Sequence, residues 1–421
     1  MSERINKPRG TSDYLYKDAD LFSGVVDFLF KNASSYGINR IEVPMYEEKR
    51  LFERTSGEDS DIVHKEMFEL VNRGDHDYVL RPEFTASINR SVIENKLYAS
   101  PDMPLKFSYC GSVFRYGRPQ KGRLREFHQF GCEYLDPKLD IYSIVECIEF
   151  LYKSLTSLLN KKLVLQINYL GGGESRANYT LALKKYYADK ISSMCEDCQR
   201  RYETNILRIL DCKVSHDKEI NASSPSILDY LTLADADLFK KILSYLNALE
   251  VPYTIDPSIV RGLDYYSGIV FEIYDPDNLS LGAIGAGGEY DHLAEEIGGQ
   301  PLKGIGFSIG LERVLLDLGE ERKAQLIAEF ERKTDIAIYD ERKDGTGLTI
   351  GSYFRKKGYR VRMLSLNKSI SSAVKEADRL ACSYFLIVKD STLSLKNMET
   401  REQIDYTIED LEEIAKYLYQ N

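Results

Sequence analysis

The feature that most constrains this chain is a change in its pattern of apolar residues near Gly319. Before that point, stretches rich in aromatic and β-branched residues, such as 106–116 and 126–134, predict strands, and 141–159 predicts a helix. After it, short strands alternate with helices over 335–419, which is typical of a compact α/β domain. A chain of 421 residues is also too long for one ordinary core. We therefore expect at least two units of different class.

The stretches between these elements suggest how the units are divided. Residues 171–248 are charged and poorer in aromatic side chains, which predicts a helical insertion between two parts of one core, 1–170 and 249–320. The mostly charged segment 321–334 predicts a helical linker. Residues 335–421 then form the small α/β domain.

Charge and hydropathy exclude some classes of protein. The formal net charge of −10 argues against general electrostatic attraction to nucleic acid. A local basic surface can still contact phosphates, and the sequence predicts one at 115–125 (RYGRPQKGRLR). The same basic residues could form a solvated face. No run of eighteen apolar residues is present and the first residues are polar, so we expect no membrane span and a cytoplasmic protein.

Four segments carry more ionisable residues and glycines than a plain core tolerates. They are LRPEFTAS (80–87), FRYGRPQKGRLREFHQFGCE (114–133), RGLDYYSGIVFE (261–272) and GIGFSIGLER (304–313). Each places Arg, Glu or Gln inside apolar sequence, where a charge must be paired or must meet a ligand. A single such segment is explained by a structural ion pair, but four in one domain favour a ligand site.

Together these segments resemble the active site of the histidyl-tRNA synthetases, a class II family. Arg115 within FRYGRPQKGR resembles the arginine of class II motif 2, and GLER (310–313) resembles motif 3. Pro44 resembles the motif 1 proline at the dimer interface. RGLDYY (261–266) is the most diagnostic block, and GGEYD (287–291) is similar to another family block. The resemblance runs essentially from end to end.

This resemblance implies a fold and an activity. The fold is an α+β catalytic domain, with the class II antiparallel sheet and flanking helices, plus a small α/β C-terminal anticodon-binding domain, in a homodimer. The activity is ATP-dependent activation of L-histidine to histidyl-adenylate and transfer to tRNA(His). ATP arrives with Mg²⁺ as the substrate complex, and no tightly bound cofactor is expected.

The resemblance also assigns the residues that handle ATP. Amino-acid activation displaces pyrophosphate as the carboxylate attacks the α-phosphate, so catalysis consists of positioning and charge stabilisation. Arginine suits this role because it stays protonated and grips phosphate oxygens in a planar fork. By resemblance, Arg115 and Arg261 flank the α-phosphate, Arg123 reaches the outer phosphates, and Arg313 lies against the adenine and triphosphate.

A histidine pocket needs polar partners for the α-ammonium and the imidazole, because buried polar groups left unpaired reject other amino acids. By resemblance, the histidine-binding residues are Arg115 and Arg261 for the carboxylate end, Glu83, Thr85 and Gln129 for the α-ammonium, and Glu133 and Tyr266 for the imidazole, with Tyr265 and Tyr290 close by. Glu133 could instead be a strand-end carboxylate and Tyr266 a core aromatic.

The loop 117–125 has the bacterial form of the family, which is associated with reading the extra 5′ guanosine of this tRNA. Arg118 and Gln120 are the candidates for tRNA binding, since both side chains can bond base edges as well as phosphates. Three positions depart from the family pattern: Phe84 stands where Gly or Met is usual, and Glu289 and His292 replace the Arg and Gly of GGRYDGL.

Seven scattered cysteines without a secretory signal predict reduced thiols and no disulfide framework. Cys195, Cys198, Cys212 and His216 have the residue types of a zinc site. Because similar cysteines are replaced by serine in some relatives, we expect no metal there.

Two alternatives share the fold but not the activity. One is a regulatory paralog, such as the histidine-biosynthesis subunit that partners a phosphoribosyltransferase; such paralogs typically lack the C-terminal domain and lose the ATP-binding residues. The other is a nonenzymatic tRNA-sensing module, usually fused to an effector. The presence of Arg115, Tyr266 and Arg313 and of the C-terminal region favours the enzyme.

Overall fold

A computed structural model describes residues 4–56, 62–71, 74, 76–260, 265–330 and 334–420. They divide into two compact units, Met1–Glu329 and Phe330–Asn421. The first contains a large, mostly antiparallel sheet with flanking helices and the second an α/β sheet, so the predicted fold class is confirmed.

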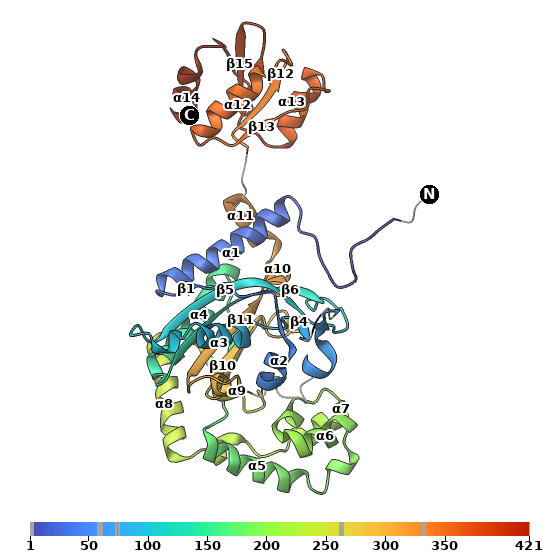
Figure 1. Ribbon diagram of the computed structural model, residues 1–421, viewed down its shortest axis with the longest axis vertical. Helices are drawn as coiled ribbons and strands as arrows, with labels where there is room; N and C mark the ends of the chain where they lie inside the picture. The colour runs from blue at the N-terminus through green and yellow to red at the C-terminus, as the bar shows by residue number, and fades with distance from the viewer. Residues whose placement is uncertain are drawn as a thin grey trace. The chain divides into compact units, whose positions relative to one another are not determined.

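The first unit is built on an eight-stranded sheet of order β1-β5-β6-β11-β10-β9-β7-β8 (Figure 1). The strands are β1 (Asn39–Arg40), β5 (Leu105–Phe114), β6 (Glu126–Asp136), β7 (Val164–Tyr169), β8 (Tyr253–Ile255), β9 (Tyr266–Tyr274), β10 (Gly285–Tyr290) and β11 (Lys303–Gly310). The six central strands run antiparallel to their neighbours, while β1 and β8 at the edges pair in parallel.

The alternation of side chains along β6 decides which groups face which helices. Phe130 points to the face covered by α1 (Lys17–Ser35) and α4 (Ile141–Leu159), where its ring contacts Phe150 of α4 edge-on at 6.5 Å between centroids. Gln129 and Glu133, at odd-numbered positions, point to the opposite face. There α3 (Thr85–Glu94) and α9 (Leu293–Glu296) pack together, beside a small sheet of β2 (Tyr46–Glu48), β4 (Tyr78–Leu80) and β3 (Phe68–Glu69).

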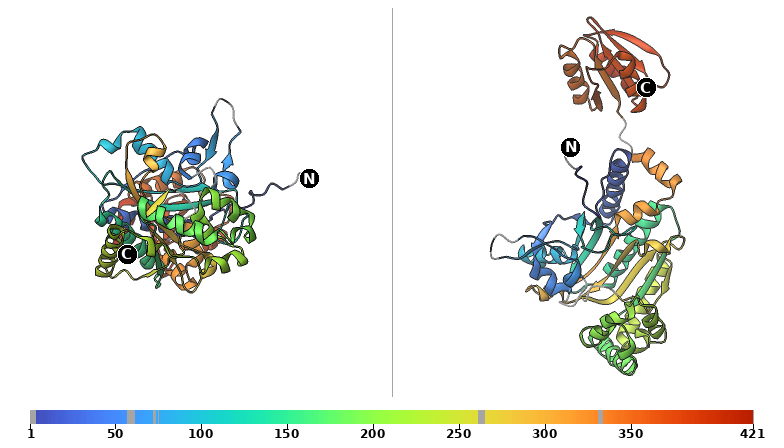
Figure 2. Two further views of the ribbon diagram at one scale, coloured as in Figure 1. Left: turned by 90° about the horizontal axis from the view of Figure 1, so that it is seen from below. Right: turned by 90° about the vertical axis from the view of Figure 1, so that its right-hand side faces the viewer.

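Between β7 and β8 lie the helices of the predicted insertion. They are the α-helices α5 (Gly173–Tyr187), α6 (Glu196–Thr204), α7 (Ser215–Asn221) and α8 (Leu233–Ala248), and the short 3-10 helices η3 (Ile191–Ser193), η4 (Ile206–Asp211) and η5 (Ile227–Tyr230). Both views show α5, α6 and α7 gathered at one end of the sheet (Figures 1 and 2). Their buried residues, such as Tyr179 and Leu183, belong to the same core cluster as Tyr266 and Tyr290 of the sheet. The insertion is therefore packed against the sheet that carries the candidate site.

The second unit has a five-stranded sheet of order β13-β12-β14-β15-β16. Its elements are β12 (Ile336–Asp340), α12 (Thr346–Lys356), β13 (Val361–Met363), α13 (Ile370–Arg379), β14 (Tyr384–Val388), β15 (Thr392–Asn397), β16 (Gln403–Thr407) and α14 (Leu411–Gln420). Side chains of α12 and α14 fill one core, and Ala373 and Ala377 of α13 fill another, so helices cover both faces.

The segment predicted as a linker contains α11 (Glu320–Phe330), and residues 331–333 lie outside the described part of the chain. Among the helices of the described residues, none is long and apolar enough to cross a membrane.

Candidate functional site

The centre of the candidate site is the buried carboxylate of Glu133 on β6. The Thr85 hydroxyl donates a hydrogen bond to its Oε1 at 2.7 Å, and the Tyr290 hydroxyl donates to its Oε2 at 2.7 Å. Gly306 lies opposite on β11, where an added Cβ would stand 1.8 Å from Oε2. Burial, with a smaller contribution from the charge of Glu83, raises the pKa of Glu133 to about 8, although hydrogen bonds from Thr85, Tyr290 and Tyr109 oppose the shift.

Glu83 fixes the position of Thr85 at the start of α3. Its carboxylate accepts the backbone N–H of Thr85 at 2.5 Å and of Ala86 at 2.9 Å, two groups that have no partner within the helix. Burial raises the pKa of Glu83, while these bonds and the charge of Arg115 oppose that shift. The α3 terminus thus brings a second acid and a hydroxyl beside Glu133.

Aromatic rings form one wall of this polar cluster. Tyr265 and Tyr266 are nearly buried, with ring centroids 4.6 Å apart, and Tyr265 lies 5.7 Å from Tyr290. Tyr266 and Tyr290 are register partners on β9 and β10. The structure therefore brings these three predicted tyrosines together around the predicted acid.

Gln129 lies on the same face of β6 as Glu133. Its amide Nε2 donates to the Ser308 hydroxyl at 3.4 Å, whereas its Oε1 is buried without a hydrogen-bond partner among the described residues. A buried acceptor left unpaired is costly unless a ligand supplies a donor. An ammonium group would supply one.

Three arginines gather beyond the acids. The Arg115 Nε donates to the Pro82 carbonyl at 2.9 Å, which holds the side chain at the end of β5. Arg313 on α10 (Leu311–Asp317) donates to the carbonyls of Gly122 at 3.1 Å and Ala283 at 2.5 Å. Burial lowers the pKa of Arg313, and the charges of Arg123 and Arg115 lower it further. Cations this close suit a polyanionic ligand.

The connection between β5 and β6 carries the predicted tRNA-binding residues. Gln120 and Arg123 bond each other through their backbones at 3.0 and 2.9 Å, which closes a turn. The side chains of Arg118, Gln120 and Arg123 are exposed. Since the Gly122 carbonyl is bonded by Arg313, the loop is tied to the arginine cluster at its tip.

Comparisons with known proteins point to one family. A sequence model of the family described as histidyl-tRNA synthetase matches residues 10–314. The chain is 38% identical to the histidine–tRNA ligase of Natranaerobius thermophilus, covering 97% of this chain and 98% of that one. It is 39% identical to the corresponding ligase of Geobacillus sp. (strain WCH70), with the same coverage. The chain belongs to the histidyl-tRNA synthetase family.

Solved structures extend the likeness to both units. The apo histidyl-tRNA synthetase of S. aureus superposes with a TM-score of 0.80 at 29% identity, covering 98% of this chain and 99% of that one. A Bacillus halodurans protein described as an ATP phosphoribosyltransferase regulatory subunit/histidyl-tRNA synthetase superposes with a TM-score of 0.64 at 19% identity, covering 92% and 98%, and shares the fold.

Several site-supporting residues were not singled out from the sequence. Arg81 donates to the carbonyls of Val43 and Pro44 at 2.8 and 3.1 Å, which fastens the segment resembling motif 1 to the sheet. Glu312 accepts the His128 backbone N–H at 2.9 Å and contacts its ring Nδ1 at 2.8 Å. Both are charged residues inside apolar sequence, and that signal could have identified them.

Other candidates lie apart from this cluster. Arg261 falls outside the described residues. His216 is exposed, and Asp217 takes its place among the cysteines. Of the departures from the family pattern, Phe84 stacks on Tyr109 at 4.3 Å, and the exposed His292 pairs with Glu295. Glu289 is buried beside the Ile269 N–H, and desolvation and Asp291 raise its pKa to about 7.

Proposed function

We propose that this chain is a histidine–tRNA ligase that activates L-histidine with ATP and transfers the histidyl group to tRNA(His). The observation that carries the proposal is the buried network of Glu133, Thr85 and Tyr290, with the arginine cluster close enough for the charge of Arg115 to act on Glu83. A buried acid with an unpaired acceptor nearby suits a small cation, and adjacent arginines suit a nucleotide triphosphate. The family to which the chain belongs supports both assignments.

In this proposal the polar cluster selects the amino acid. Glu83, Thr85 and Gln129 bind the α-ammonium of histidine, for which the unpaired Gln129 Oε1 supplies an acceptor. Glu133 and Tyr266 bind the imidazole nitrogens, with Tyr265 and Tyr290 packed beside them. An amino acid without an imidazole would leave these buried groups unpaired, which disfavours its binding.

The arginines then handle the phosphates. The histidine carboxylate attacks the α-phosphorus of ATP, the bond to the β-phosphate oxygen breaks, and pyrophosphate leaves with the Mg²⁺ that arrived with ATP. Arg115 and Arg261 stabilise charge at the α-phosphate, Arg123 holds the outer phosphates, and Arg313 lies against the adenine and triphosphate. A ribose hydroxyl at the acceptor end of the tRNA next attacks the acyl carbon and releases AMP.

The remaining assignments follow the family resemblance. Arg118 and Gln120 contact the acceptor end of the tRNA. The chain acts in the cytoplasm as a homodimer formed through the Pro44 region. Its catalytic core spans 1–170 and 249–320, interrupted by the insertion 171–248, and the linker 321–334 leads to the anticodon-binding domain 335–421.

The test is ATP–pyrophosphate exchange with each standard amino acid, on the wild type and on Arg261→Ala. We expect exchange with histidine alone, reduced about 10²- to 10³-fold in the variant because charge stabilisation at the α-phosphate is lost. Arg40→Ala is the matched control, since Arg40 is exposed and paired with Glu42. A folded, ATP-binding protein without exchange would support the regulatory paralog instead.

A further inference from the structure

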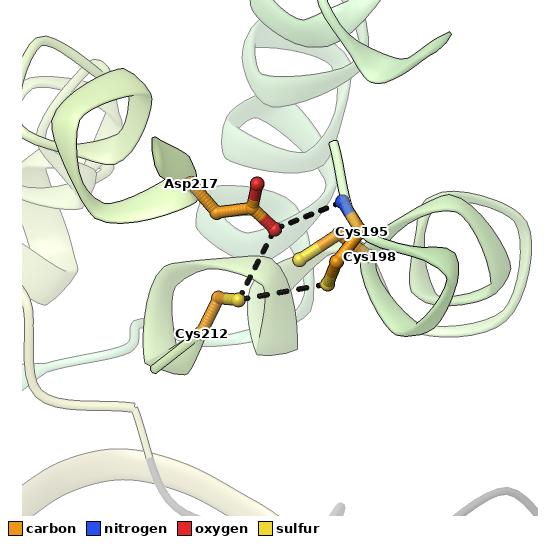
Figure 3. Close-up of side chains that lie close together, drawn as sticks. All are labelled: Cys195, Cys198, Cys212 and Asp217. Atoms are coloured by element: carbon orange, nitrogen blue, oxygen red, sulfur yellow. Dashed lines mark hydrogen bonds between the residues drawn. The ribbon is translucent and has the colours of Figure 1, made fainter. Parts of the chain in front are cut away.

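The inserted helices bring together a set of side chains that the aminoacylation chemistry does not use. Cys195, Cys198, Cys212 and Asp217 each offer one ligand atom, and these four atoms lie within 4.8 Å of one another. Figure 3 shows the three sulfurs and the carboxylate turned toward one another. We propose that these four residues bind one zinc ion that fastens the small helices of the insertion together.

The distances fit tetrahedral zinc. Two sulfurs bound to zinc at about 2.3 Å and at a tetrahedral angle are separated by about 3.8 Å. The Sγ atoms of Cys195 and Cys212 are 3.8 Å apart. This is far longer than a disulfide bond of about 2.0 Å. The pair thus already has the spacing of two zinc ligands.

The carboxylate supplies a second, independent observation. Asp217 is 1% exposed; its Oδ2 accepts the Cys195 N–H at 3.1 Å and the Cys212 thiol at 3.2 Å. Its Oδ1 is buried with no hydrogen-bond partner in the described part of the chain. A buried carboxylate in this state is expensive unless a cation joins it. The structure thus places one carboxylate oxygen of Asp217 against the cysteines, and leaves the other oxygen buried without a partner among the described residues.

The fourth ligand is Asp217 and not the neighbouring histidine. His216 precedes it in α7 but is exposed, whereas Asp217 is buried with Cys198 and Cys212. With three sulfurs and one oxygen, the ligand set is complete and leaves no position open for a substrate. A closed tetrahedral set is the mark of a structural zinc site.

The ligands come from three separate short elements. Cys195 and Cys198 lie at the start of α6, Cys212 follows η4, and Asp217 lies in the first turn of α7. The start of a helix favours thiolates over thiols, and zinc binding would release the thiol protons. One ion would therefore add a link between elements too short to be stable alone, beside the apolar side chains that these elements already bury.

The experiment measures zinc content in the full chain, purified with a phosphine reductant, incubated with zinc chloride alone and desalted. We expect about one zinc per chain by elemental analysis, as a single four-ligand site requires. Asp217→Asn and Cys198→Ser should each lose most of it. His216→Ala and Cys382→Ser are the matched controls, since His216 is exposed and Cys382 belongs to the second unit; both should keep it.

Two further measurements keep the proposal falsifiable if a variant folds poorly. Substitution of cobalt for zinc in the wild type should give the visible spectrum of a tetrahedral cobalt–thiolate centre. Removal of zinc by a chelator should lower the melting temperature, and added zinc, but not magnesium, should restore it. The proposal would be overturned if the wild type retained no zinc. It would also be overturned if, without reductant, the wild type bound no metal and lost two titratable thiols to a disulfide. Loss of zinc from His216→Ala but not from Asp217→Asn would also overturn it.

Discussion

At the scale of single residues, the fold changes the chemistry of Glu133 most clearly. Its carboxyl group is buried and accepts hydrogen bonds from the hydroxyls of Thr85 and Tyr290, and burial is the main cause that raises its pKa to about 8. The unfolded chain, with a pKa near the ordinary value, releases this proton at lower pH than the folded chain does. The contribution of Glu133 to stability is therefore fully present below about pH 4.5 and is lost as the pH rises through about 8.

Because ionising the buried Glu133 destabilises the folded chain, we predict that Glu133→Gln changes stability and activity in opposite directions at high pH. An amide of the same shape cannot ionise, so the variant should melt at a higher temperature than the wild type at pH 8.5 and show little gain at pH 5. The rise of the Glu133 pKa to about 8 corresponds to at most about 5 kcal/mol in the free energy of unfolding. Histidine-dependent pyrophosphate exchange should fall about ten- to a hundredfold, because the amide offers histidine one acceptor oxygen fewer and one hydrogen bond is lost. Melting curves and exchange rates at both pH values test this.

Glu149→Gln is the control, because it removes a partly buried acid from α4, on the opposite face of the sheet. It should leave histidine-dependent exchange unchanged. If Glu133→Gln kept full exchange, Glu133 would be a structural strand residue and not part of the histidine site.

Sequence reasoning located some of these residues and missed others for a physical reason. Glu133 was identifiable because its neighbours resemble a family block. Asp217 was not, since its carboxylate meets the cysteines only through the turn between η4 and α7, and the adjacent His216 is the more familiar zinc ligand. Which of two neighbouring side chains points inward is decided by packing.

At the scale of elements, the glycines of β11 make room for the acid on β6. Gly306→Ala would place a methyl group 1.8 Å from the Glu133 carboxylate, inside a sheet that cannot open without losing its pairing. We expect a loss of about 1–3 kcal/mol in stability from this overpacking, together with weaker histidine binding. Urea unfolding and the KM for histidine in pyrophosphate exchange measure the two effects.

Gly319→Ala provides the matched control, because nothing lies within 4 Å of a Cβ added there. It should change neither quantity. Equal behaviour of the two variants would mean that Glu133 can move away freely, and that its position is not fixed by β11.

The loop between β5 and β6 gives a second prediction at this scale. Arg118→Ala and Gln120→Ala should each lower kcat/KM for charging tRNA(His) by about 10- to 100-fold, the effect of losing one base-edge contact of 1–3 kcal/mol. Histidine-dependent pyrophosphate exchange, which needs no tRNA, should stay unchanged. Lys121→Ala removes an exposed charge from the same loop and serves as the control for phosphate attraction alone. Equal losses in all three variants would indicate charge attraction without base recognition.

Most elements could be predicted from periodicity, and the exceptions are instructive. Helix α4 has the predicted bounds because its apolar residues recur at helical spacing and Asp140 caps its start. The polar and apolar residues of 39–44 alternate as in a strand, yet β1 is limited to Asn39–Arg40, since the carbonyls of Val43 and Pro44 are bonded by the Arg81 side chain. The sequence does not indicate strand β16, because this strand lies at the sheet edge and alternates exposed and half-buried residues among polar ones.

At the scale of the whole molecule, the negative net charge disfavours binding of polyanions, whereas the proposed function requires binding of ATP and tRNA. A chain of net charge −10 should repel a polyanion, yet three arginines gather at one site, where burial and then the charges of Arg123 and Arg115 lower the pKa of Arg313. Fields close to a surface are set by local charge, and salt screens the distant acids within about 10 Å. The sign of the total charge therefore says little about this site.

The division into two units predicts that activation and charging can be separated. Every candidate residue for histidine and ATP within the described chain belongs to Met1–Glu329, and Phe330–Asn421 has its own cores. A chain ending at Glu329 should therefore keep histidine-dependent pyrophosphate exchange within a few-fold, while kcat/KM for charging tRNA(His) falls at least about tenfold, or 1.4 kcal/mol, because anticodon contacts are lost. Both rates are measured beside the full chain, with circular dichroism to confirm folding. Undiminished charging would remove the anticodon-binding role from the second unit, and loss of exchange from a folded short chain would show that this unit supports the catalytic one.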